Sequence, residues 1–253
     1  MKTVLKTVKD NFKATNKTLF IFSVLLFLYT TIRAFLLSIT WDEAYSYLEF
    51  VRTGNLYSRD FNSMSANNHL LYTFLEIPFA NLFGASEFVL RLPSLIAHIM
   101  FLFYSAKLVK HFNDKWLVLA SFLVINLNPY LLDFFSLARG YGLSLGLMMA
   151  SLYYLYLFQN IGKNKFSMLS LLLGALGVLA NYVLLNYYLA LFGMVMILLL
   201  YNSIKSGNTA TQKRMFFLKD SVIPIVILSL LLLLILPITF KLKEAGALFF
   251  WWK

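Results

Sequence analysis

The stretch HLLYTFLEIPFANLF, at His69–Phe83, decides the fold, because every later segment changes sides according to whether this one crosses a membrane or lies along its surface. It contains Glu76 and Pro78 and is shorter than the roughly 20 apolar residues that a crossing helix needs. Its apolar residues recur at helical spacing on one face, at Leu70, Leu71, Phe74, Leu75, Phe79, Leu82 and Phe83. The pattern predicts a helix over 69–83 that lies in the membrane interface.

Apolar segments with the length of a membrane crossing surround this stretch. With 60% hydrophobic and 13% charged residues, the chain of 253 residues is far more apolar than a soluble domain. Seven segments are predicted to cross, at 19–39, 92–109, 116–135, 140–158, 166–183, 184–201 and 221–240. The first is too long for the core of a signal peptide and is predicted to be an anchor. The predicted fold is an all-α integral membrane protein, a single transmembrane module over 1–253 with about seven transmembrane helices and an amphipathic juxtamembrane helix in the first outer loop, 40–91.

The positive charges set the predicted orientation. If 69–83 lies flat and the amino terminus is cytoplasmic, the basic residues of the later loops also become cytoplasmic; these are Lys107, Lys110, Lys115, Lys163, Lys165, Lys205, Lys213, Arg214 and Lys219. The positive-inside rule favours this arrangement. It puts the loop 40–91 and the carboxyl terminus on the outer face of a plasma or inner membrane. The net charge of +11 is scattered between apolar segments, which argues against nucleic acid as a partner, and without cysteine the chain has no cysteine metal site.

Adjacent carboxylates follow the first predicted span, in TWDEAYS at 40–46. A carboxylate of Asp42 or Glu43, partly desolvated at the membrane surface, has the chemistry of a general base, and the two together can hold a divalent cation. Trp41 is a candidate substrate contact beside them. The structural alternative is that Trp41 and Tyr45 belong to an interfacial aromatic belt and that the acids cap a helix.

Polar residues also precede the flat helix, at Asn67, Asn68 and His69. Helix N-termini attract anions, and a histidine with two amides there can hold a phosphate or orient an acceptor hydroxyl. The alternative is that Asn68 is an ordinary N-cap and that His69 lies at the interface. His98, in the middle of a predicted span, is expected to bond to a neighbouring helix.

Two arginines are predicted at the same membrane face. Arg91 opens the second span, and Arg139 lies between Asp133 and Tyr141, where the third span ends and the fourth begins. The planar fork of Arg139 matches a phosphate. The alternative for both arginines is a side chain that snorkels to the lipid headgroups. Acids beside phosphate-binding arginines at one lipid surface suit displacement of a lipid-linked phosphate.

These motifs, in order, resemble the membrane glycosyltransferases of the C superfamily, in the branch of protein O-mannosyltransferases and bacterial lipid A aminoarabinose transferases. The matching pieces are Asp42-Glu43, His69 at the start of a juxtamembrane helix, Phe83-Gly84 followed by Arg91 to Ser94, and Asn128-Pro129 followed by Ala138-Arg139 and Tyr141. The resemblance covers about 40–141. Beyond that range only the helix count is similar.

The resemblance implies inverting transfer of a sugar from a polyprenyl-phosphate carrier to a lipid, glycan or protein acceptor. It implies Asp42 as the base, with Glu43 as the second choice, and Arg139 as the ligand of the lipid phosphate. Tyr141, Arg91 and His69 are expected to assist at the phosphate, and substrate contacts are expected from Trp41, Asn67, Asn68 and Asp133. No cofactor is certain, and a divalent metal at Asp42 and Glu43 stays open.

Two departures from the family pattern change the expectations. The mannosyltransferases have two prolines after the histidine, whereas His69 is followed by Leu70-Leu71, so the acceptor end of the site is expected to differ. The family's chains also continue with further helices, so this sequence is expected to hold the amino-terminal transmembrane module only.

Two other classes of function stay open. A flippase for a lipid-linked saccharide would also need charges facing a phosphate, although the predicted spans from Gly140 onward contain almost no ionisable residue. A non-catalytic subunit or fragment is the second alternative.

Overall fold

The computed structural model describes residues 2–56, 68–206 and 209–244, with side chains from Thr15 onward in these ranges apart from Ser206. The predicted substrate contact at Asn67 and the end of the chain at 245–253 lie outside the described residues. Within the described ranges all regular structure is helical. Five helices are long and apolar enough to cross a membrane: α1 (Lys2–Leu36, apolar from Thr15), α4 (Glu87–Val109), α7 (Gly140–Ile161), α9 (Leu185–Ser206) and α10 (Ala210–Glu244). For the described residues, the prediction of an all-helical fold with several helices able to cross a membrane is therefore confirmed.

The predicted span over 116–135 is not one continuous helix. It is divided into α5 (Lys115–Asn126) and α6 (Pro129–Phe135), which bend by 60° at the break. Pro129 has no N–H to continue the helical ladder, and the Asn128 side chain instead accepts from the Tyr130 N–H at 3.0 Å, as an N-cap. Counting this bent pair as one span gives six candidate crossings in the described residues, so the predicted count of seven is not confirmed.

The segment predicted to cross at 166–183 forms a shorter helix. This helix, α8 (Asn164–Ala180), has 17 residues and is about 25 Å long. It ends at Ala180. The side chain of the next residue, Asn181, accepts from the Val183 N–H at 3.2 Å and starts the 3-10 turn η3 (Tyr182–Leu184) ahead of α9. The chain therefore reverses direction between α8 and α9 within a few residues.

The predicted outer loop contains two short helices. The first, α2 (Trp41–Ser46), continues into the π-helical turn η1 (Tyr47–Val51), and α3 (Leu70–Phe83) follows the part that is not described. In α3 the buried residues are Tyr72, Thr73 and Glu76, whereas the Phe74, Leu82 and Phe83 side chains are exposed. A helix with polar groups inside and apolar groups outside suits a lipid border rather than water.

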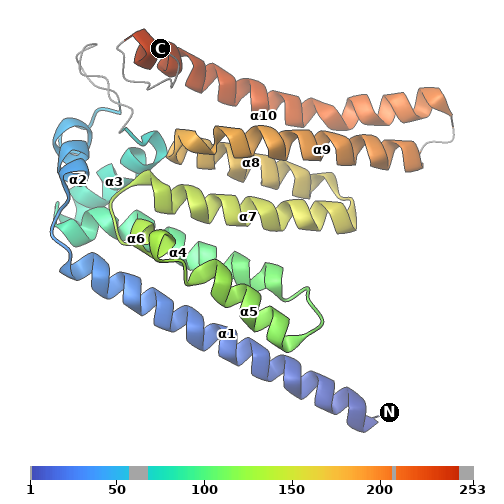
Figure 1. Cartoon of the computed structure of the whole chain (residues 1–253). Helices are drawn as coiled ribbons and strands as arrows, with labels where there is room; N and C mark the ends of the chain where they lie inside the picture. The colour runs from blue at the N-terminus through green and yellow to red at the C-terminus, as the bar shows by residue number, and fades with distance from the viewer. Residues whose placement is uncertain (1, 57–67, 207–208, 245–253) are drawn as a thin grey trace, which may run out of the picture.

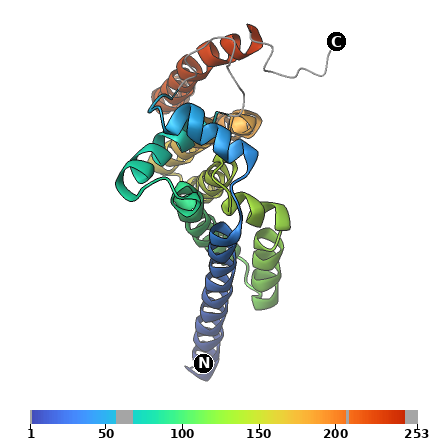
Figure 2. The same ribbon diagram turned by 90° about the vertical axis from the view of Figure 1, so that its left-hand side faces the viewer.

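The long helices stack side by side in the order α10, α9 with α8, α7, α4 and α1, as Figures 1 and 2 show. The middle of the stack is the core, because 56% of the apolar window of α4 is buried but only 17% of that of α10. Close packing between α4 and α7 needs Gly146, since a methyl group there would lie 2.7 Å from the Ala97 carbonyl oxygen. Leucines and phenylalanines cover the outer helices, so lipid is the solvent that this surface fits.

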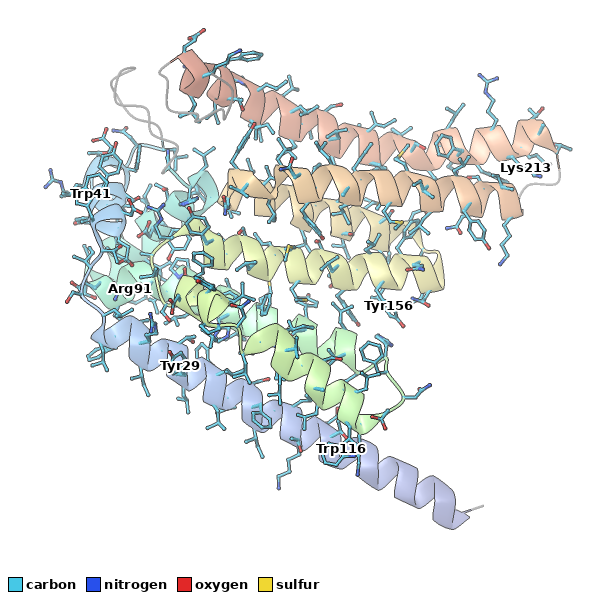
Figure 3. The ribbon with its side chains drawn as sticks, in the orientation of Figure 1. Tyr29, Trp41, Arg91, Trp116, Tyr156 and Lys213 are labelled. Carbon is cyan, nitrogen blue, oxygen red and sulfur yellow. The ribbon has the colours of Figure 1, made fainter. Side chains whose placement is uncertain are left out.

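The two ends of the bundle carry different side chains. Trp41 and Arg91 lie at one end in Figure 3, whereas Trp116, Tyr156 and Lys213 lie toward the other. We call the first the site end, defined by α2, α3, Arg91 and Arg139. The second, defined by Lys110, Lys115, Lys163 and Lys213, is the lysine end.

Candidate functional site

Three helix starts build the site end. The chain leaves α1 at Leu36, forms α2, and later brings the beginnings of α3 and α7 against it. Asp42 and Glu43 are in α2, His69 precedes α3, and Arg139 precedes α7. The structure thus collects residues that are almost 100 positions apart in sequence, since 95 residues separate Glu43 from its hydrogen-bond partner Ala138.

Glu43 is buried and its carboxylate is fully bonded. With Thr40 it forms a capping box at the start of α2: Glu43 Oε2 accepts from the Thr40 N–H at 2.8 Å, and Thr40 Oγ1 accepts from the Glu43 N–H at 3.4 Å. Glu43 Oε1 accepts from the Ala138 N–H at 2.6 Å. Burial acts to raise the pKa of Glu43, but the hydrogen bonds from Arg91, Ala138 and Thr40 outweigh it and hold the pKa below its ordinary value. Glu43 is therefore an ionised structural anchor in this arrangement.

Arg91 is the main partner of Glu43 and is completely buried. Its Nε and Nη2 donate to Glu43 Oε1 and Oε2, each at 2.8 Å. Its Nη1 donates to the carbonyls of Ala34 and Leu37, at 2.8 and 2.7 Å, and Nη2 also donates to the Ser38 carbonyl at 3.1 Å. These bonds use all five N–H groups of a guanidinium. The assignment of Arg91 to a lipid phosphate stays a prediction, and the contacts in the structure tie α4 to α2 and to the end of α1.

Asp42 and Arg139 form the exposed counterpart of this pair. Arg139 Nη1 lies 3.3 Å from Asp42 Oδ2, and the Asp42 side chain is 48% exposed whereas that of Arg139 is 5% exposed. Neighbouring helix residues point about 100° apart, so α2 turns Glu43 inward and Asp42 toward the surface. The accessible acid of the pair is Asp42, and it faces a buried cation.

Tyr141 supports Arg139 and His69 from the first turn of α7. The guanidinium carbon of Arg139 lies 5.6 Å from the centre of the Tyr141 ring. His69 meets the same ring edge-on at 5.0 Å between ring centres, and Phe134 stacks on it at 4.7 Å. The aromatic ring therefore joins the beginnings of α3 and α7.

His69 is buried against the start of α7. A methyl group at Gly140 would collide with the Ala180 carbonyl oxygen and lie 2.7 Å from His69 Cβ and Cγ, so only glycine lets these segments meet. Burial, followed by the positive charge of Arg139, lowers the pKa of His69 to about 4. A hydrogen bond with the Ala180 backbone and the charge of Asp42 act in the opposite direction but are outweighed. His69 is therefore neutral at pH 7, and its Nε2 atom is buried without a hydrogen-bond partner among the described residues.

Glu76 and its surroundings were not among the predicted site residues. Glu76 is 1% exposed, and its Oε2 has no hydrogen-bond partner in the described part of the chain. Burial, followed by the charge of Glu43, raises the pKa of Glu76 well above its ordinary value. Beside it the Tyr72 hydroxyl donates to the Leu90 carbonyl at 3.0 Å and lies 3.1 Å from Ser94 Oγ, which donates to the Leu137 carbonyl at 2.6 Å. An acid within an otherwise apolar helix was the sequence signal for this group.

The remaining predicted residues lie around this centre. Trp41 is 75% exposed and stacks on Tyr45. His69, not Asn68, is the N-cap of α3. The Asn68 Nδ2 atom instead donates to the Leu56 carbonyl at 2.6 Å. Asp133 pairs with Arg33 at 2.8 Å, a contact that the sequence did not predict. His98 Nδ1 lies 2.8 Å from Thr30 Oγ1 of α1, which confirms its predicted bond to a neighbouring helix.

The two acids of α2 face different partners. Among the described residues, no group of three or more His, Asp or Glu side chains gathers as a metal site. Each carboxylate of the pair is instead compensated by its own arginine, Asp42 by Arg139 and Glu43 by Arg91. This geometry does not fit a cation shared between Asp42 and Glu43.

Comparison of the chain with protein-family models, with curated proteins and with solved structures gave no match. We therefore infer the function from the geometry of the site end.

Proposed function

We propose that the chain crosses the membrane seven times, with the site end on the outer face. The five long helices, the bent pair α5–α6 and the 17-residue α8 are the crossings, and α3 lies at the outer surface. Two observations support this. α8 packs along α7, and the loops after α4 and α7, whose sequences contain or adjoin several lysines, lie at the end opposite to Arg91 and Trp41.

The function we propose is transfer of a sugar from a polyprenyl-phosphate carrier to an acceptor hydroxyl or amine at this outer face. The observation that carries the proposal is the ion pair of Asp42 with Arg139. A partly exposed carboxylate next to a buried guanidinium offers a base and an anion ligand within one side-chain length of each other. From the sequence we expected both residues at one membrane face, and the ion pair joins them directly although 97 positions separate them in the sequence.

In the proposed reaction the acceptor oxygen or nitrogen attacks the anomeric carbon of the sugar from the face opposite to the phosphate. The bond between that carbon and the phosphate oxygen breaks, and the electron pair leaves with the polyprenyl phosphate. Asp42 takes the proton of the acceptor, and Arg139 stabilises the charge on the departing phosphate. Attack from the opposite face inverts the configuration at the anomeric carbon.

Other residues of the site end position these two groups. Glu43 and Arg91 hold the start of α2 against α1 and α4, which fixes the direction of Asp42. Tyr141 and His69 pack beside Arg139, and in the proposal the neutral His69 contributes a hydrogen bond rather than a charge. Trp41, Asn68 and Asp133 are left as candidate contacts to the sugar or the acceptor.

A transfer assay with the whole chain in proteoliposomes tests the proposal. Radiolabelled polyprenyl-phosphate mannose and polyprenyl-phosphate aminoarabinose serve as donors, with an envelope extract as the source of acceptors. We expect label to move to an acceptor with release of polyprenyl phosphate, and Asp42→Asn to slow this by about 10²-fold or more. The control Asp220→Asn, in α10 near the lysine end, keeps the wild-type rate.

The other outcomes point to the alternative classes. Carrier that crosses the bilayer with its sugar still attached identifies a flippase. No transfer with either donor, together with co-purification of a second membrane subunit, identifies a non-catalytic partner. If Asp42→Asn keeps full transfer activity, Asp42 is not the base of the reaction.

A further inference from the structure

A groove of about 380 Å³ lies between α1 and α4, toward the lysine end. The two helices run antiparallel and are tied together near the site end by the bonds of Arg91 to Ala34 and of His98 to Thr30. Farther along, Leu19 and Leu26 of α1 pack with Leu102 and Val109 of α4 in one buried cluster. Leu19 and Leu102 also line the groove, so this cluster forms its inner wall.

The walls of the groove are apolar and open to the lipid side of the bundle. Val24 and Phe27 line it from α1, and Ile99 and Phe103 line it from α4. The side chains of Phe20 and Phe103 are 68% and 52% exposed along it. A surface of this kind in a membrane is covered by acyl chains.

The groove has the length of one leaflet. Its α1 side runs from Asn16 to Phe27, and at 1.5 Å per residue this is about 17 Å. Half of a hydrocarbon core of about 30 Å is nearly the same length. One acyl chain therefore fits lengthwise between the two helices.

Two lysines close the groove at the lysine end. The Lys107 ammonium lies 4.4 Å from the centre of the Phe103 ring and 5.2 Å from that of Tyr153, which holds it at the mouth. Lys110 lies one turn farther on and also lines the groove. In the part of the chain that the structure describes, neither lysine forms an ion pair with a carboxylate. Two cations at the end of an apolar channel are complementary to an anionic headgroup.

We propose that this groove binds an anionic glycerophospholipid of the leaflet at the lysine end, with an acyl chain along α1 and α4 and the headgroup phosphate between Lys107 and Lys110. The inference does not depend on the proposed transferase, because the carrier of that reaction would present its phosphate at the opposite end of the bundle. The bound lipid would fill the space that α1 and α4 leave between them.

Native mass spectrometry of the full chain, released from detergent with equal amounts of phosphatidylglycerol and phosphatidylcholine, tests this inference. We expect the wild type to retain phosphatidylglycerol preferentially, and Lys107→Gln with Lys110→Gln to reduce that preference by up to about 30-fold, since each lysine near an anionic lipid contributes roughly fivefold. The matched control is Lys163→Gln with Lys165→Gln. These lysines lie at the same end, after α7, but outside the groove.

A second variant separates the groove from the charges. Val24→Trp fills the groove and leaves both lysines in place, so it should reduce retention of both lipids. A thermal unfolding measurement checks that the variant is folded. Three outcomes would each overturn the proposal. The wild type could retain the two lipids equally, the two double-lysine variants could lose the preference for phosphatidylglycerol to the same extent, or Val24→Trp could retain as much lipid as the wild type. Displacement of phosphatidylglycerol by polyprenyl phosphate in a manner that needs Lys107 and Lys110 would overturn the choice of occupant.

Discussion

Arg91 and Glu43 form a buried two-point ion pair across 48 residues of sequence, and the same guanidinium also binds three backbone carbonyls at the end of α1. Removing one partner of such a pair leaves an uncompensated charge in the interior. We expect Arg91→Met to lower the free energy of unfolding by about 3 to 5 kcal/mol, measured by denaturation in detergent. Arg33→Met breaks the partly exposed pair with Asp133 and should lower the free energy of unfolding far less. Equal losses in the two variants would contradict a structural role for Arg91.

Gly140→Ala tests the close approach of three segments at the site end. The added methyl group would collide with the Ala180 carbonyl and crowd the His69 ring, so α7 must move away from both. We expect a lower thermal midpoint together with a loss of transfer activity. Gly193→Ala is the matched control, because nothing lies within 4 Å of a methyl group there and alanine favours a helix. A Gly140→Ala protein as stable as Gly193→Ala would show that the approach is looser than described.

His69 should make stability depend on pH. Its folded pKa of about 4 lies below the ordinary value of 6.5, so the unfolded chain binds a proton at a higher pH than the folded chain does. Stability is therefore lost as the pH falls from about 6.5 to 4, by up to about 3 kcal/mol from this residue. Thermal midpoints measured across this range should fall less steeply for His69→Gln than for the wild type. His111→Gln, in the exposed turn after α4, should keep the wild-type slope; a wild-type slope for His69→Gln as well would exclude His69 as the cause.

Glu76 should behave in the opposite sense. Burial raises its folded pKa well above that of an unfolded glutamate, so its contribution to stability is present below the ordinary pKa and is lost as the pH rises. Glu76→Gln keeps the shape and removes the proton equilibrium. We expect the variant to be at least as stable as the wild type at pH 7.5 and to lose that advantage near pH 4.5, in thermal denaturation at both values. Destabilisation at pH 7.5 would mean that the ionised carboxylate has a role of its own.

The sequence predicts the helical membrane architecture well, because apolar length is a property of each segment alone. Leu70–Phe83 was predicted to within one residue for the same reason. The break at Asn128-Pro129 was harder, since apolar composition continues across it and only the cap and the proline indicate a bend. The helix count depends on how such a bent pair is treated.

The site end depended on partners that sequence patterns do not reveal. From the sequence we named all four charged residues, Asp42, Glu43, Arg91 and Arg139. Their pairing depends on the direction in which α2 presents Asp42 and Glu43, which the sequence does not show. One local signal existed. Thr40 followed three residues later by Glu43 is the pattern of a capping box, which indicates a structural role for Glu43 before any fold is known. Glu76 stood out in the sequence as an acid within an apolar helix, but its partners and its burial arise from the packing of α3 on its neighbours.

In the proposed seven-crossing arrangement, the bend between α5 and α6 has a consequence for the surrounding bilayer. α5 has 12 residues and is about 18 Å long, whereas an unbroken crossing such as α7 has 22 residues and is about 33 Å long. In that arrangement, lipids next to α5 would meet a hydrophobic mismatch, to which a bilayer responds by local thinning. Such thinning would bring headgroups at the site end inward to the depth of α6, where Asp133 and Arg33 pair. A lipid-linked phosphate approaching from that side would then travel a shorter distance through hydrocarbon to reach Arg139.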